Sequence, residues 1–481
     1  MCLSRSTDMD AAEFRVKAKE VVDFIADYME TIGNRRVSPR VRPGYLTGTF
    51  PKFAPTEPES FDDLMKDFHG KILPGILHHQ HPHFNAYFPV GHSFASILGA
   101  MLSDGIGSIS TSWAISPACT ELEMIVTDWI GKTLFSKLIS LPIQFLHEGG
   151  IGGGSIQGSG SECVFLALSA AKRKGLQSVP AGQNPRLVAY TSCLANICVQ
   201  KASLLASVTL RQIPVDKNLS LSVAALKKSI TADRASGFTP FFVCATVGTT
   251  SCCSFDNVSA LAEVCDKESL WLHVDAAYAG CALICPEYQY LIDGKERFTS
   301  FSFNPHKWLL TTVECALLWV NDKKSLTDCL TVNATYLQHR HQDVTTDFRN
   351  WGIGITRPFR ALKVWFVLRL YGTKGLQEFI RKHIKLAKRM KDYIEASPIF
   401  EIVGQSNLGL VAFHVMGPNR LTTQLLQKVN DSGTLHVTEA SVNSRSVIRY
   451  VVCAENAAEG DVDFAWNVIS SASDEIFSSR G

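Results

Sequence analysis

The feature of this sequence that most restricts its fold is a series of short, strongly apolar runs between residues 94 and 320. Four of these runs are "RLVAY" (186–190), "FFVCATVG" (241–248), "LWLHVD" (270–275) and "CALLWV" (315–320). They are too hydrophobic for strands with one face in water, so they indicate parallel strands that are buried on both faces. Because helical stretches separate the runs, the sequence predicts an α/β fold with a doubly wound, mainly parallel sheet.

The segments on either side of this region predict two further parts of the molecule. From Met9 to about Ile32, apolar residues recur at helical spacing, and proline-rich chain follows. This pattern predicts a helical arm that needs another surface to pack on. After Arg360 a strongly helical stretch precedes "FEIVGQSNLGLVAFHV" and "SVIRYVVCAE", which predict strands of a smaller α+β domain. We therefore expect an arm over residues 1–93, a large domain over 94–364 and a small C-terminal domain over 365–481.

Composition excludes several classes of function. The 481 residues are 46% hydrophobic and 19% charged with a formal net charge of +2, so the chain lacks both the basic field of a nucleic-acid binder and the polarity of a disordered protein. No apolar run reaches the roughly 18 residues of a membrane span, and the charged start does not resemble a secretory signal. These observations predict a cytoplasmic protein whose partners are small molecules or another copy of itself. Its 14 scattered cysteines are expected to be reduced.

Polar side chains follow three of the predicted strands directly. In an open α/β sheet, ligands bind at the carboxyl ends of the strands, so these side chains are candidates for a site. An acid and a lysine at neighbouring strand ends would also be explained by a structural ion pair. The side chains in question are Thr249, Thr250, Asp275, Asn304, His306 and Lys307.

A glycine-rich segment, "GGIGGGSIQGSGSE", leads into the helical run "SECVFLALSAAKRK". Ser159, Gly160 and Ser161 would present backbone N–H groups and hydroxyls at a helix N-terminus, which favours a bound phosphate, although a flexible linker would have a similar composition. A phosphate site combined with Asp275 and Lys307 suggests pyridoxal 5'-phosphate. In that chemistry the lysine forms a Schiff base with the cofactor, and the aspartate keeps the pyridine nitrogen protonated.

Five motifs carry a resemblance to a known family. They are "HPHFNAYFP" (81–89), "SPACTELE" (116–123), "GTTSCCSFDN" (248–257), "HVDAAYAG" (273–280) and "FNPHKW" (303–308). In this order they resemble the aromatic-L-amino-acid decarboxylases, which are group II pyridoxal-phosphate enzymes of fold type I. The likeness runs from about Met9 to the last helix. It implies an aromatic amino acid as substrate and a homodimer with shared active sites, which would give the N-terminal helix its partner.

The resemblance also implies roles for individual residues. Lys307 would be the Schiff-base lysine, Asp275 the partner of the pyridine nitrogen, and Ala277 a contact of the ring. The segment "NATYLQHRHQD" (333–343) resembles the family's mobile loop, with Tyr336 as its catalytic tyrosine. The phosphate and neighbouring groups would be held by Ser159, Gly160, Ser161, Thr250, Asn304 and His306.

Asn196, in "SCLANIC", stands where the amine-forming members of the family have a histidine that helps to protonate the substrate Cα after CO2 is lost. An amide does not titrate near neutral pH and does not relay a proton as imidazole does. The electrons left on the substrate would then be available to O2, giving an aldehyde, ammonia and hydrogen peroxide. Asparagine here resembles the insect 3,4-dihydroxyphenylacetaldehyde synthases, also called alpha-methyldopa hypersensitive proteins. An amine-forming decarboxylase and a catalytically weak homologue are the alternatives.

The expected substrate pocket departs from the family pattern. Val90 stands where a threonine commonly contacts the catechol, and Ser110 and Thr111 replace the usual glycine and phenylalanine. Cys193, Leu194 and Ile197 differ from the usual neighbours of the proton-handling position. L-Dopa is the expected substrate, but tyrosine or phenylalanine remains open. The substrate-binding candidates are Tyr87, Val90, Ile109, Thr111 and Asn196.

The cluster "HHQHPHF" contains His78, His79, His81 and His83 and has the residue type of a metal site. Its place in the resemblance assigns it to the pocket wall and the surface, so no metal is expected.

Overall fold

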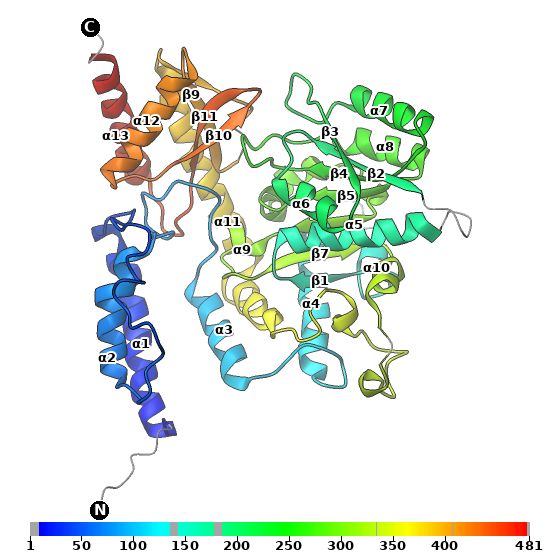
Figure 1. Cartoon of the computed structure of the whole chain (residues 1–481), viewed down its shortest axis with the longest axis horizontal. Coiled ribbons are helices and arrows are strands. Elements are labelled where there is room, and N and C mark those ends of the chain that lie inside the picture. Colours follow the sequence, from blue (N-terminus) through cyan, green and yellow to red (C-terminus); the bar gives the residue numbers. More distant parts are fainter. Residues whose placement is uncertain (1–8, 135–142, 178–184, 333, 407, 479–481) are drawn as a thin grey trace, which may run out of the picture.

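The computed structural model describes residues 9–134, 143–177, 185–332, 334–406 and 408–478. Within these residues, seven strands form one sheet in the order β1-β7-β6-β5-β4-β2-β3, with helices on both faces (Figure 1). This confirms the predicted α/β fold. The strands are β1 (Gly153–Gln157), β2 (Arg186–Ser192), β3 (Thr209–Ile213), β4 (Phe238–Thr246), β5 (Trp271–Asp275), β6 (Ser300–Phe303) and β7 (Ala316–Val320).

Strand direction agrees with the prediction for most of the sheet but not at one edge. The pairs β2/β3, β2/β4, β4/β5 and β5/β6 are parallel. The run "CALLWV", predicted to be a parallel strand, forms β7, which is antiparallel to both β6 and β1. All five residues of β7 are buried, so a strand buried on both faces has the same continuous apolar sequence whichever way it runs.

The glycine-rich segment is a strand in part. Its residues Gly153–Gln157 form β1, which is wholly buried at the sheet edge. A Cβ on Gly154 would lie 2.5 Å from Nε1 of Trp319 on the paired strand, so only glycine fits there. The small residues of β1 therefore allow close packing against the neighbouring strand. The phosphate-loop candidates follow β1 in the chain.

Helices connect the strands and cover the sheet. The N-terminus of α5 and that of α6 lie at the carboxyl edge of the sheet, beside the ends of β4 and β5. The helices of this part are α3 (Phe94–Ile106), α4 (Pro117–Leu134), α5 (Gly160–Gln177), α6 (Ile197–Leu205), α7 (Val223–Ala235), α8 (Val258–Glu268), α9 (Pro305–Trp308) and α10 (Lys323–Leu330).

A second, four-stranded antiparallel sheet lies toward the C-terminus, in the order β10-β11-β9-β8. The predicted boundary between residues 364 and 365 falls inside the long helix α11, which bends at Gly372 (φ 63°, ψ 171°) and links the two sheets (Figure 1). The elements of this part are α11 (Arg360–Ala396), β8 (Phe400–Ile402), β9 (Leu410–Val415), α12 (Asn419–Ser432), β10 (Thr438–Val442), β11 (Arg445–Val451) and α13 (Glu459–Ser478).

The N-terminal helices α1 (Ala11–Thr31) and α2 (Phe61–Asp67) stand to one side of the large sheet (Figure 1). An ion pair joins them, with Lys17 Nζ 2.9 Å from Asp62 Oδ1. No residue of α1 is buried within the described part of the chain, and Phe14 is 61% exposed. Residues 1–8 of the expected arm lie outside the described residues.

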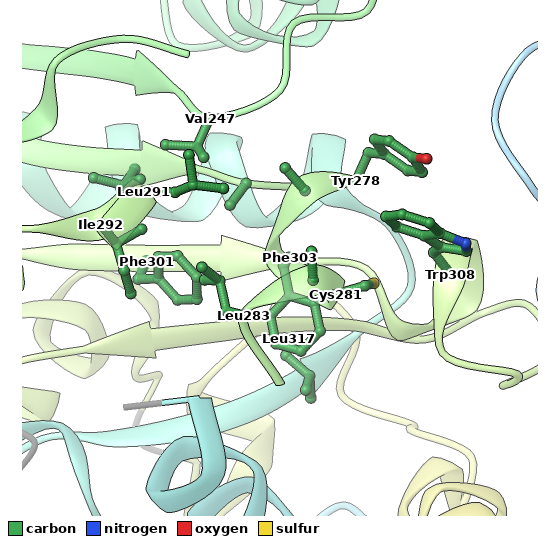
Figure 2. Close-up of a cluster of buried hydrophobic side chains, with 14 of the residues drawn as sticks. Val247, Tyr278, Cys281, Leu283, Leu291, Ile292, Phe301, Phe303, Trp308 and Leu317 are labelled. Carbon is green, nitrogen blue, oxygen red and sulfur yellow. The ribbon is translucent and has the colours of Figure 1, made fainter. Parts of the chain in front are cut away.

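The core beneath the carboxyl edge of the sheet is rich in aromatic side chains. Phe303 stacks on Trp319 with a centroid distance of 5.7 Å, and Tyr278 stacks on Trp308 at 4.6 Å. Figure 2 shows Tyr278 and Trp308 at one end of this cluster and Phe301 and Phe303 within it. The rings bury large apolar areas and support the strand ends that carry the candidate site.

Two further sequence features have a place in the structure. No helix among the described residues combines the length and hydropathy needed to cross a membrane. The histidines of "HHQHPHF" bind protein groups: His78 Nδ1 lies 2.7 Å from the Tyr28 hydroxyl, and His81 Nε2 lies 3.1 Å from the Arg35 carbonyl.

A buried ion pair holds α4 against β1 and the start of α11. Arg357 donates to both carboxylate oxygens of Glu123, at 2.6 and 3.0 Å, and to the Ile156 carbonyl at 2.8 Å. Glu123 also accepts from the Ile156 N–H at 2.8 Å. Both side chains are almost fully buried, whereas Arg360 pairs with Glu314, whose side chain is 67% exposed.

We expect Arg357→Leu to lower the free energy of unfolding by about 3–5 kcal/mol, because it leaves the buried carboxylate of Glu123 without a partner. The matched change Arg360→Leu should cost less than about 1 kcal/mol, because its partner remains solvated. Urea denaturation of the two variants measures both values. Equal effects would contradict the importance of the buried pair.

Candidate active site

A cavity of about 240 Å³ lies at the carboxyl ends of the central parallel strands. It brings together most of the residues predicted from the sequence, although they come from five separate segments of the chain. Its lining consists of Phe88, Ser159, Gly160, Ser161, Asn196, Cys198, Thr246, Gly248, Thr250, Asp275, Ala277, Tyr278, Asn304 and Lys307.

Strand pairing sets the positions of the two ionisable residues of this cavity. Asp275 is the last residue of β5, and Lys307 lies in the short helix α9 just after β6, the next strand of the sheet. Both side chains line the cavity, and the charge of each acts on the pKa of the other. A group bound in this cavity would therefore have both residues in its wall.

The environment moves both pKa values toward the neutral forms. Burial raises the pKa of the Asp275 carboxyl, while Lys307 and the N–H of Ala277, which donates to Oδ1 at 3.0 Å, oppose that shift. Burial lowers the pKa of the Lys307 amine, and Asp275 opposes this. A lysine with a lowered pKa is a better nucleophile near neutral pH, and a buried carboxylate gains from a cationic partner.

The N-terminus of α5 lines the cavity. Ser159 precedes the helix, and its hydroxyl accepts from the N–H of Glu162 at 3.2 Å, while Gly160 and Ser161 begin the first turn. A Cβ on Gly160 would lie 3.1 Å from the side-chain amide of Asn304, so glycine permits this close approach. The Oδ1 atom of Asn304 is buried and has no hydrogen-bond partner.

These observations fit pyridoxal phosphate. The helix N-terminus with Ser159, Gly160 and Ser161 offers the donors that a phosphate needs, and the same cavity holds the carboxylate that a pyridine nitrogen needs. The unpartnered amide oxygen of Asn304 lies in the same cavity and is available to a bound group.

Asn196 lies in the cavity with its amide held at both ends. It is the N-cap of α6, where Oδ1 accepts from the N–H of Cys198 at 3.0 Å. Its Nδ2 donates to Oγ1 of Thr250 at 2.9 Å. These two bonds fix the orientation of the amide, because exchanging O and N would place a donor against the helix N–H.

Several predicted site residues lie elsewhere in the described chain. His306 does not line the cavity: its Nδ1 accepts from the Cys315 N–H at 2.9 Å, and burial lowers its pKa to about 4, so its ring is neutral at neutral pH. Tyr336 is 83% exposed. The other residues that do not line the cavity are Tyr87, Val90, Ile109 and Thr111.

A much larger cleft, of about 1300 Å³, lies between α4, α10 and residues 338–351. Residues Ala334, Gln338, Gln342 and Asp343 of the segment predicted to be a mobile loop line this cleft. None of the candidate site residues that follow the strands lines this cleft. The smaller cavity is therefore the better candidate for the active site, despite its size.

The sequence reading missed some lining residues. The Cys198 thiol lies 4.0 Å from Asp275 Oδ2 and is only two positions from Asn196. Tyr278 and Gly248 stand inside motifs that carried the resemblance, so their positions were a signal for the site. Phe88 also stands inside a motif that carried the resemblance, and it lies at the cavity wall with Lys307 Nζ 4.5 Å from its ring centroid.

Comparison with known proteins gives consistent results. The family model described as "Pyridoxal-dependent decarboxylase conserved domain" matches residues 43–416. The aromatic-L-amino-acid decarboxylase of Mus musculus is 44% identical, and the alignment covers 97% of this chain and 99% of that protein.

Two solved structures have nearly the same fold over the whole chain. Oryza sativa TDC with PLP and tryptamine superposes with a TM-score of 0.94 at 34% identity, covering 98% of this chain and 100% of that one. Rhodiola rosea 4-hydroxyphenylacetaldehyde synthase gives a TM-score of 0.91 at 36% identity, covering 97% and 99%. The fold, the cavity and these similarities together establish that the chain belongs to the pyridoxal-dependent decarboxylase family.

Proposed function

We propose that this protein decarboxylates an aromatic L-amino acid, with L-dopa as the expected substrate, and passes the electrons left on the substrate to molecular oxygen. The balanced reaction converts L-dopa, O2 and water into 3,4-dihydroxyphenylacetaldehyde, CO2, NH3 and H2O2. Family membership supports the decarboxylation step, and the names of the mouse relative and the Rhodiola rosea structure support an aromatic side chain. The position of Asn196 in the cavity supports the oxidative step.

Pyridoxal phosphate, when bound, supplies an electron sink for the bond that breaks at the substrate Cα. In the proposed site, Lys307 would attach the cofactor, and the carboxylate of Asp275 would pair with its pyridine nitrogen. Ser159, Gly160 and Ser161 at the α5 N-terminus would hold the phosphate, with Asn304 in the same cavity. Ala277 would contact the ring. These roles follow the chemistry of each side chain and its place in the cavity.

Asn196 carries the choice between products. Its Oδ1 is used by the helix cap and its Nδ2 by Thr250, and neither atom titrates near neutral pH. The side chain therefore orients its neighbours without delivering a proton to Cα. Slow protonation leaves the electrons of the broken bond available to O2, and hydrolysis of the oxidised product releases the aldehyde and ammonia.

An amine-forming decarboxylase is the second candidate. The relatives with 41–45% identity over nearly the full chain are named as decarboxylases, among them the mouse protein. In that case another group would protonate Cα. Tyr336 of the loop is the candidate donor, although it is exposed and outside the cavity of its own chain.

We also propose that the active form is a homodimer with shared sites. The helix α1 buries none of its residues, and α3 exposes apolar side chains, including Leu98 and Leu102 at 49% each. A second copy would cover these faces. The partner copy would also complete the substrate site, for which Tyr87, Val90, Ile109 and Thr111 are candidates outside the cavity.

The experiment that tests the oxidative proposal is the replacement Asn196→His. We expect the molar ratio of amine to aldehyde to rise at least about tenfold, since general acid catalysis by a positioned imidazole contributes about 10²-fold or more. The matched control is Asn196→Ser, which keeps the helix cap but adds no titratable group, and should leave the product mainly aldehyde. Chromatography of the products measures both ratios. The same product ratio in the two variants would show that other residues decide the outcome.

Lys307→Ala should reduce turnover by at least about 10³-fold, because the variant has no amine to attach the cofactor. Fold and cofactor affinity should change much less, since the phosphate and pyridine contacts remain. Borohydride reduction followed by mass spectrometry provides the direct check: the wild type gains a cofactor adduct on Lys307 and the variant does not. An adduct on another lysine in the wild type would overturn the assignment.

Leu102→Glu should convert the dimer, whose mass would be twice 52.9 kDa, into a monomer, because it places a charge in the proposed apolar interface. Activity should fall with dissociation. Met416→Glu changes an equally exposed apolar residue of the small sheet region and should leave the mass unchanged. Sedimentation equilibrium distinguishes these results, and a monomeric wild type with full activity would contradict the shared-site proposal.

A further inference from the structure

Arg449 is a buried cation for which the proposed chemistry gives no role. It lies on β11 of the small sheet and is 2% exposed. Its Nη2 donates to the Tyr87 carbonyl at 2.8 Å, while its Nε has no hydrogen-bond partner. Among the described residues, no carboxylate forms an ion pair with it.

The groups around Arg449 do not neutralise its charge. They include the thiols of Cys253 and Cys453 and the hydroxyl of Tyr278, which stay uncharged because burial raises their pKa values. A buried guanidinium without a counter-ion is unfavourable and seldom retained for stability alone. The positive charge of the Arg449 guanidinium therefore acts on the groups nearest to it.

The nearest part of the active site is Phe88. The Cζ atom of Arg449 lies 5.0 Å from the centroid of this ring, and Lys307 Nζ lies 4.5 Å from the same centroid. The ring also stacks on Tyr278 at 4.4 Å, and Tyr278 stacks on Trp308, the neighbour of Lys307 (Figure 2). The two cations are thus within about 10 Å of each other, across apolar side chains that screen charge poorly.

Tyr87 and Phe88 connect the two sheets at this point. Tyr87 has a φ of 53°, which a non-glycine residue rarely adopts, and its carbonyl accepts the Arg449 hydrogen bond. The bond ties the segment that carries Phe88 to the small sheet. Arg449 thereby holds the ring that forms the cavity wall beside the lysine.

We propose that Arg449 is a positioning residue for Lys307: it fixes Phe88 against the lysine, and its uncompensated charge keeps more of the lysine amine in the neutral, nucleophilic form. This inference rests on the proposed function of Lys307 as the residue that attaches the cofactor. It does not depend on whether the final product is an aldehyde or an amine.

The groups that face Lys307 determine whether removal of Arg449 raises or lowers the pKa of the lysine amine. Burial lowers the pKa of the amine most strongly, Asp275 on β5 raises it, and Arg449 lowers it. The thiols of Cys198 on α6 and Cys281 also lie near the amine but are uncharged, because burial raises their pKa values. The Arg449 charge and burial therefore both lower the pKa of the Lys307 amine, whereas the Asp275 carboxylate raises it. Removing the cation should raise the pKa of Lys307 and reduce the neutral fraction at pH 7.

The test is the rate at which the apoenzyme captures pyridoxal phosphate, followed by the appearance of its visible absorption band from pH 6 to pH 10. Capture needs the neutral amine. Arg449→Gln removes the charge but keeps a donor for the Tyr87 carbonyl, and Arg449→Lys keeps a charge. The control is Arg445→Gln on the same strand, where the arginine side chain is 43% exposed and paired with Glu401.

We expect Arg449→Gln to move the midpoint of the pH profile upward by about half a unit and to slow capture at pH 7 about threefold. Arg449→Lys should retain most of the wild-type profile, and Arg445→Gln all of it. An unchanged profile in Arg449→Gln, or an equal shift in Arg449→Lys, would overturn the proposal. If Arg449→Gln does not fold, as judged by thermal unfolding, Arg449→Met provides the same comparison.

The outcome is separable from failure of the proposed function. Capture without an adduct on Lys307 in the wild type would remove the role of the lysine itself. A normal adduct on Lys307, with a capture profile that does not depend on Arg449, would refute only the positioning role of Arg449.

Discussion

The in-register pairing of β4, β5 and β6 is the constraint on which the site depends. Thr246 pairs with Asp275, and Asp275 pairs with Ser302, so the three strands end at nearly the same level. The segments that leave these strand ends carry Thr250, Ala277 and Lys307 into one cavity. Because parallel strands align their carboxyl ends, residues about 30 positions apart in the chain meet without any long-range motif.

Two helix N-termini complete that arrangement. The start of α5 offers hydrogen-bond donors to the cavity, and the start of α6 is capped by Asn196. Asn196 has a structural role as the N-cap of α6 and a proposed role in product choice. The cap and the bond to Thr250 explain why an asparagine is stable there, and the same two bonds leave the side chain with no proton to transfer. The proposed oxidation therefore follows from an ordinary structural role.

The sequence predicted the features that depend on local pattern. The buried apolar runs predicted the strands of the sheet. The polar residues that follow those runs predicted that Asp275, Asn304 and Lys307 lie close together, and all three line one cavity. The direction of β7 was wrong, because a buried strand has the same apolar pattern in either direction. The strand β1 was missed, because its glycines are required by the close approach of His147 to Gly153 and of Trp319 to Gly154 and not by a turn. Arg449 could not be found, because Phe88 lies far from it in the chain and no local pattern records their contact.

The proposed reaction passes to O2 the electrons that CO2 leaves behind. It is tested by the stoichiometry of O2 consumed to CO2 released when the purified, cofactor-loaded protein turns over L-dopa. We expect a ratio near one, with equimolar aldehyde, ammonia and, in the absence of catalase, hydrogen peroxide. Dopamine formed in proportion to CO2 with no oxygen uptake would contradict it.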